Sequence, residues 1–139
     1  MTDNERLAEL LFPNISWTPQ QYEEQYPARQ LPEGARVTRF SPSPTGYLHI
    51  GGLFAAMTAR LTAKATSGVF FLRIEDTDKK REVEGGVTAI VTGLAAFGIT
   101  PDEGITGLGT ESGVYGPYQQ SKRLSLIHIS EPTRRSYIS

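Results

Sequence analysis

The chain has 139 residues, of which 38% are hydrophobic and 21% charged, a balance typical of one soluble globular domain. Its formal net charge of −1 provides no overall attraction to nucleic acid, so any RNA contact must come from local patches. The sequence has no cysteine, which excludes disulfides and thiolate zinc sites within these residues.

The N-terminal residues predict a helical arm rather than a targeting signal. They lack the basic and apolar regions of a signal peptide, and no apolar run in the chain is long enough to span a membrane, so a cytoplasmic location is expected. Leu7, Leu10 and Leu11 have the spacing of a helix face. Residues 18–21, Thr-Pro-Gln-Gln, combine a helix cap, a proline at the first helical position and a capping-box glutamine. We expect residues 1–35 to form this arm.

The next elements predict a strand, a helix and a second strand. Residues 36–40 are short and β-prone, and residues 52–66 have helical apolar spacing that ends at Gly68 as a C-cap. Residues 69–74 are apolar apart from Arg73, as is typical of a buried parallel strand. This order predicts a βαβ unit, and therefore an α/β fold with a parallel sheet.

The following residues predict one further helix and a loop. The helix is expected over residues 83–97 and ends at Gly98, although Gly85 and Gly86 weaken the prediction of its start. Residues 100–117 are rich in glycine, threonine and acids, which indicates a mobile loop.

Two polar clusters follow the two predicted strands. The first, residues 41–52, is a proline-stiffened loop that enters a helix through a histidine and two glycines. The second, residues 75–78, is Glu-Asp-Thr-Asp. Because the carboxyl ends of parallel strands meet at one edge of a sheet, we expect both clusters to converge on one pocket.

The residue types in these clusters indicate phosphate binding. A helix start attracts phosphate, His49 can donate to its oxygens, and Gly51 and Gly52 would let a nucleotide approach the backbone. Arg39 is suited to a bidentate contact with a carboxylate. Each residue also has a plainer interpretation. His49 could be an ordinary loop histidine, Arg39 a surface or salt-bridge residue, and residues 75–78 a solvated turn or a weak magnesium site. The chain has neither a P-loop nor the glycine pattern of dinucleotide-binding proteins, so the residues alone predict a phosphate-binding α/β domain.

Three blocks together resemble the N-terminal catalytic region of the glutamyl-tRNA synthetases. They are residues 39–52 (RFSPSPTGYLHIGG), 72–78 (LRIEDTD) and 116–123 (GPYQQSKR), so the resemblance covers about residues 36–123. Residues 42–46 and 75–78 are similar to the glutamyl type rather than to the sister glutaminyl enzymes. The resemblance implies the first half of a class I synthetase Rossmann-like nucleotide-binding fold, with a parallel sheet and a βαβ unit, truncated after residue 123.

The resemblance also implies a reaction and a set of site residues. The full-length enzyme would be a monomer that activates glutamate with ATP and Mg²⁺ to glutamyl-adenylate, and then transfers the glutamyl group to tRNA(Glu) for protein biosynthesis. Phe54 and Ala55 stand where an Arg-Thr pair is common in the family, beside one wall of the amino-acid pocket; we expect this departure to change helix packing more than chemistry. No metal site in the protein is implied. The implied catalytic residues are His49, Gly51 and Gly52, and Gly52 replaces the second histidine of the class I signature. Glutamate would be bound by Arg39, Ser41, Ser43 and Glu75, with Glu75 facing the α-ammonium group. ATP would be bound by Pro42, Ser43, Thr45, Gly46, His49, Gly51 and Gly52.

The end of the chain departs from this family. Residues 124–134 resemble the in-frame translation of a transposase-type sequencing adapter, so we expect a non-native tail over residues 124–139 and no ligand role for His128. The alternative is a genuine divergent tail. With residues 36–123 as a partial catalytic domain, the fragment is expected to show negligible aminoacylation. The functional alternatives are a non-catalytic nucleotide-binding module and a glutamyl-queuosine-type tRNA-modifying synthetase.

Overall fold

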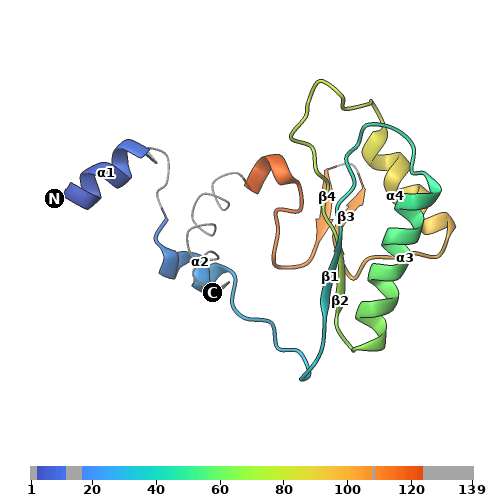
Figure 1. The fold of residues 1–139 in the computed structure, drawn as a ribbon, viewed down its shortest axis with the longest axis horizontal. Helices are drawn as coiled ribbons and strands as arrows, with labels where there is room; N and C mark the ends of the chain where they lie inside the picture. The colour runs from blue at the N-terminus through green and yellow to red at the C-terminus, as the bar shows by residue number, and fades with distance from the viewer. Residues whose placement is uncertain (1–2, 12–16, 108, 124–139) are drawn as a thin grey trace. The chain divides into compact units, whose positions relative to one another are not determined.

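A computed structural model describes residues 3–11, 17–107 and 109–123 of the chain (Figure 1). These residues belong to two compact units, one up to Ala28 and one from Arg29 to Arg123. The adapter-like tail expected over residues 124–139 lies outside the described residues.

The first unit contains the two predicted helices, α1 (Asp3–Leu11) and α2 (Pro19–Gln25). The Thr18 hydroxyl accepts from the Gln21 backbone N–H at 3.3 Å, and the Gln21 side chain accepts from the Thr18 N–H at 2.7 Å. This reciprocal pair confirms the predicted capping box. Among the described helices, none is long and apolar enough to cross a membrane.

The second unit is an α/β sheet with helices on one face. The first three strands are parallel and the fourth is antiparallel, in the order β1-β2-β3-β4. Figure 1 shows both long helices, α3 and α4, on the same side of the sheet. The predicted βαβ unit is therefore confirmed. The elements are β1 (Val37–Phe40), α3 (Ile50–Ala65), β2 (Val69–Leu72), α4 (Gly86–Ala96), β3 (Glu103–Gly107), β4 (Thr110–Ser112) and the 3₁₀ helix η1 (Gln120–Arg123).

The core explains which side chains face the helices. Phe70, Leu72 and Ile74 are buried in one apolar cluster with residues of α3 and α4, whereas Phe71 and Arg73 are only partly buried. Successive strand side chains point to opposite faces, so the even-numbered residues of this stretch face the helices and the odd-numbered ones face the other side. This alternation determines on which face of the sheet each polar side chain of this segment lies.

The structure corrects both ends of the first predicted sheet helix. α3 begins at Ile50, two residues earlier than predicted, because the His49 side chain caps it. At the other end the left-handed residue is Ser67, with φ of +53°, and not Gly68. Gly68 is required for a different reason, since a Cβ there would lie 1.9 Å from the Arg36 carbonyl oxygen.

Two further predictions are wrong in part. α4 begins at Gly86 rather than at residue 83, because Gly85 is left-handed (φ +75°) and Gly86 lies against the Pro44 carbonyl. Its predicted end is confirmed, with Gly98 at φ +67°. Residues 100–117 are not simply a loop, since they contain β3 and β4. β3 joins the sheet where the Asp102 N–H donates to the Phe70 carbonyl at 2.8 Å.

Candidate active site

The two predicted clusters lie side by side at the carboxyl edge of the sheet. Beyond the ends of β1 and β2, the Arg73 N–H donates to the Phe40 carbonyl and the Glu75 N–H to the Pro42 carbonyl, both at 3.0 Å. The Val83 N–H donates to the Pro44 carbonyl at 2.9 Å. The proline loop is therefore held along its length by the chain that follows β2.

A pocket of about 310 Å³ opens beside this loop, on the helix side of the sheet. It contains most of the residues predicted to bind ATP. Gly51, which was predicted with them, and the glutamate-binding candidates Arg39, Ser41 and Glu75 do not line it. The lining residues are Phe40, Pro42, Ser43, Thr45, Gly46, Tyr47, Leu48, His49, Gly52 and Ile90.

His49 occupies the cap of α3, where its orientation is fixed by the helix. Its Nδ1 accepts from the Gly52 N–H at 3.4 Å, so in the neutral ring the proton is on Nε2, which remains able to donate. A Cβ at Gly51 would lie 3.1 Å from Cε1 and 3.2 Å from Nδ1 of this ring. Gly51 therefore makes room for the imidazole itself, a role that sequence reasoning missed.

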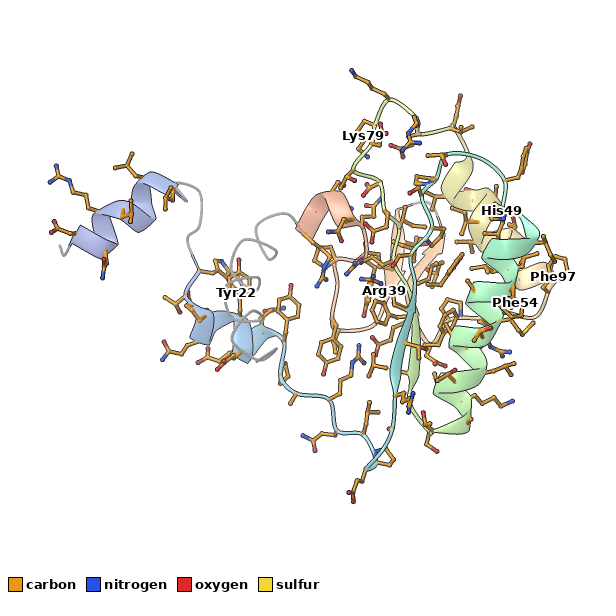
Figure 2. All side chains as sticks on the ribbon, viewed as in Figure 1. Tyr22, Arg39, His49, Phe54, Lys79 and Phe97 are labelled. Carbon is orange, nitrogen blue, oxygen red and sulfur yellow. The ribbon has the colours of Figure 1, made fainter. Side chains whose placement is uncertain are left out.

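Two of the glutamate-binding candidates, Arg39 and Glu75, belong to the opposite face. In Figure 2, Arg39 lies on the side of the sheet away from α3, whereas His49 lies at the start of that helix. Arg39 is paired in register with Phe71, which is on the helix-free face. The Glu75 carboxylate accepts from Arg73 Nη2 at 3.0 Å and from Nε at 3.3 Å. The structure thus separates the predicted residues into two groups on either side of one proline loop.

Asp76 is a residue of the acidic cluster whose role the sequence did not reveal. It is 2% exposed, and its carboxylate accepts from the Ser121 N–H at 2.8 Å, the Ser121 hydroxyl at 2.6 Å and Lys79 Nζ at 3.1 Å. Burial raises the pKa of Asp76, but the hydrogen bonds from Ser121 and Lys79 outweigh it and lower the net pKa below the usual value. A charged Asp76 therefore anchors residue 121 to the segment that carries Glu75.

A second network fixes the same C-terminal segment to β3. Arg29 donates to both oxygens of Glu103, at 2.5 and 2.6 Å, and its guanidinium carbon lies 3.8 Å from the centre of the Tyr115 ring. The Tyr118 hydroxyl donates to Glu103 at 2.8 Å. The bond from Arg29 lowers the pKa of Glu103, and burial together with Glu103 raises the pKa of Tyr118 to about 12. The sequence offers no local pattern for this network, because Arg29 and Glu103 are 74 residues apart.

The described residues do not provide a magnesium site. No group of three or more histidine, cysteine, aspartate or glutamate side chains among them could hold a metal ion. The pocket lining also has no carboxylate, and magnesium in nucleotide sites is usually bound by one or two carboxylates as well as by phosphates.

Comparisons with known proteins identify the family. The model of the family "tRNA synthetases class I (E and Q), catalytic domain" matches residues 36–130. The chain belongs to this family. It is 52% identical over 122 residues to the glutamate–tRNA ligase of Clostridium perfringens strain 13, covering 88% of this chain and 22% of that protein. The glutamate–tRNA ligase of Clostridium beijerinckii is also 52% identical, over 124 residues, covering 89% of this chain and 22% of that protein.

A solved structure supports the same assignment. The glutamate-tRNA synthetase from Elizabethkingia anophelis has a TM-score of 0.62 and 40% identity, covering 73% of this chain and 20% of that chain. The expected resemblance and the expected α/β fold are therefore confirmed, with the four-stranded sheet as part of a class I synthetase catalytic domain. The chain spans about a fifth of the length of the relatives it matches.

Proposed function

We propose that the chain provides the amino-acid and nucleotide sites of a glutamate–tRNA ligase, an enzyme of protein biosynthesis that uses ATP. The observation that carries the proposal is the pairing of two unlike sites at one sheet edge. One is a pocket without carboxylates at the start of α3, and the other is a face with Arg39 and with Glu75 bonded to Arg73. Family membership and relatives named glutamate–tRNA ligases support the same reaction. A cytoplasmic, monomeric enzyme remains part of this proposal.

In the first step, the α-carboxylate of glutamate attacks the α-phosphorus of ATP. The bond to the β-phosphate oxygen breaks, which gives glutamyl-adenylate and pyrophosphate. Nε2–H of His49 and the positive start of α3 would stabilise the charge on the phosphate oxygens, where Gly46 leaves the backbone open. Catalysis of this kind depends on positioning and on charge, without a covalent enzyme intermediate.

Glutamate itself would be held on the helix-free face. Arg39 would clasp its side-chain carboxylate and Glu75 would accept from its α-ammonium group. Ser41 would help to place it, and Ser43 would contact it from the pocket side of the proline loop. This arrangement keeps the side-chain carboxylate away from the triphosphate, since Arg39 and His49 lie on opposite sides of the sheet. In the second step, a hydroxyl of the terminal tRNA ribose attacks the acyl carbon, and AMP leaves.

Calorimetric titration with non-hydrolysable glutamyl- and glutaminyl-adenylate analogues tests the proposal. We expect the glutamyl analogue to bind more tightly, because only its side chain carries a negative charge that attracts the guanidinium of Arg39. Arg39→Ala should abolish this preference, with a loss of about 10²-fold for one charged, bidentate contact. Arg36→Ala is the matched control, since Arg36 is an exposed arginine just before the same strand. Equal affinity for both analogues, or no binding of either, would contradict the proposal.

A further inference from the structure

Two side-chain oxygens in the second unit are buried without a hydrogen-bond partner. They are Ser41 Oγ and Gln120 Oε1, the only such atoms among the described residues. An unpaired buried polar group costs about 1–3 kcal/mol, and native structures rarely retain one without a reason. Ser41 is a candidate for glutamate binding, whereas Gln120 has no role in the proposed function.

The backbone register places Gln120 beside Glu75. The Ile74 N–H donates to the Tyr118 carbonyl and the Gln120 N–H donates to the Ile74 carbonyl, both at 2.9 Å, so Ile74 and Gln119 form a parallel bridge. One residue further along each segment, Glu75 is opposite Gln120. Gln120 is the first residue of η1, and its backbone lies next to the Ile74–Glu75 segment.

The position of Gln120 is fixed by its neighbours in the chain. Ser121 is held by two hydrogen bonds to the buried Asp76. Arg123 donates to the carbonyls of Tyr115 and Pro117 at 3.1 and 2.9 Å. These bonds fix the backbone next to Gln120, which lowers the entropy lost when the segment binds a ligand.

We propose that Gln120 is a further amino-acid-binding residue, whose amide oxygen accepts a hydrogen bond from the α-ammonium group of glutamate next to Glu75. The inference rests on the proposed function. An ammonium group has three N–H donors and no acceptor, and the Glu75 carboxylate is already shared with Arg73. The unpaired atom of Gln120 is an acceptor, so it suits the ammonium group and not either carboxylate of the substrate.

The test compares L-glutamate with glutarate, the same five-carbon dicarboxylate without the amine. Both are titrated into the ¹⁵N-labelled chain and followed by NMR, with thermal unfolding measured in parallel. Gln120→Leu should weaken the binding of glutamate about tenfold and leave that of glutarate unchanged. Its melting temperature should be equal or higher, because the variant removes an unpaired buried group. Gln120→Glu retains an acceptor and should bind glutamate at least as well as the original chain.

Gln119→Leu is the matched control, because Gln119 is the adjacent glutamine and is opposite Ile74 instead of Glu75. It should change the binding of neither ligand. If the original chain does not bind glutamate, the proposed function is contradicted, and this inference with it. If the chain binds glutamate and Gln120→Leu binds it equally well, only the role of Gln120 is overturned. An equal loss for glutamate and glutarate would also overturn it, since the effect would not depend on the ammonium group.

Discussion

Replacing Asp76 by alanine should be among the most destabilising changes in the second unit. The substitution leaves the Ser121 N–H and hydroxyl without their charged acceptor in a site where Asp76 is only 2% exposed. Each hydrogen bond to a charged group contributes roughly 1.5–3 kcal/mol. Lys79 is exposed, so solvent screens its ion pair with Asp76 and the pair adds little to the stability. The expected loss is therefore about 3–5 kcal/mol, against a total stability of about 5–15 kcal/mol.

Urea and thermal unfolding followed by circular dichroism would measure this loss. The melting temperature should fall by on the order of 15–25 °C for a unit of this size. Ser121→Ala is the graded control, because it removes the hydroxyl bond and retains the backbone bond, and should cost about 1–2 kcal/mol. A loss below about 1 kcal/mol for Asp76→Ala would refute the reasoning, since it would mean that the buried carboxylate contributes almost nothing.

The same carboxylate should make stability depend on pH. Burial raises the pKa of Asp76, but the bonds from Ser121 and Lys79 lower it overall. Because the pKa in the folded chain lies below the unfolded value of about 4, the stabilisation is fully present above that pH. It is lost as the pH falls through the folded pKa. In Asp76→Asn this part of the acid-induced loss should be absent, and an unchanged acid profile would contradict the assignment.

Three further predictions concern the glycines and Tyr118. Gly68→Ala should prevent stable folding, measured by circular dichroism, because its Cβ would overlap a backbone carbonyl. Gly93→Ala should instead raise the stability by about 0.5–1 kcal/mol, because its Cβ would make only ordinary contact with Leu48 at 3.8 Å; similar effects of both would contradict the geometry. Gly51→Ala should weaken ATP binding in calorimetry while retaining the fold, because the Cβ crowds the imidazole of His49; unchanged binding would argue against this positioning. Tyr118→Phe should remove the tyrosinate absorbance step near pH 12, because burial and Glu103 raise the pKa of Tyr118 to about 12. The stabilisation from this raised pKa is fully present below the unfolded pKa of about 10 and is lost as the pH rises towards 12. The variant should therefore lose stability less steeply over this range, and an unchanged titration would refute the assignment.

Sequence reasoning succeeded where the signal is local. The capping box at Thr18 and the βαβ unit follow from short patterns of turn residues and apolar spacing, and the structure contains both. β3 was missed because Glu-Gly-Ile-Thr-Gly has only one large apolar residue, Ile105, and low β-propensity. Pairing with β2 imposes its strand conformation, which no reading of a single segment can detect.

The site shows the same division between local and long-range information. The sequence placed both clusters at one sheet edge, because the ends of parallel strands determine that edge. It did not show that their side chains divide between two faces, since this depends on the register between β1 and β2. Asp76 and Gln120 also went unrecognised, because their roles come from contacts between segments about 45 residues apart.

The central claim is that ATP and glutamate occupy opposite sides of one proline loop. NMR titration of the ¹⁵N-labelled chain with each ligand separately tests it most directly. ATP should shift the amides of residues 43 and 45–52, the non-proline residues of the loop and of the start of α3. Glutamate should instead shift those of residues 39–41, 73–75 and 120. If both ligands shift the same residues, or if glutamate shifts none of its own set, the account is contradicted.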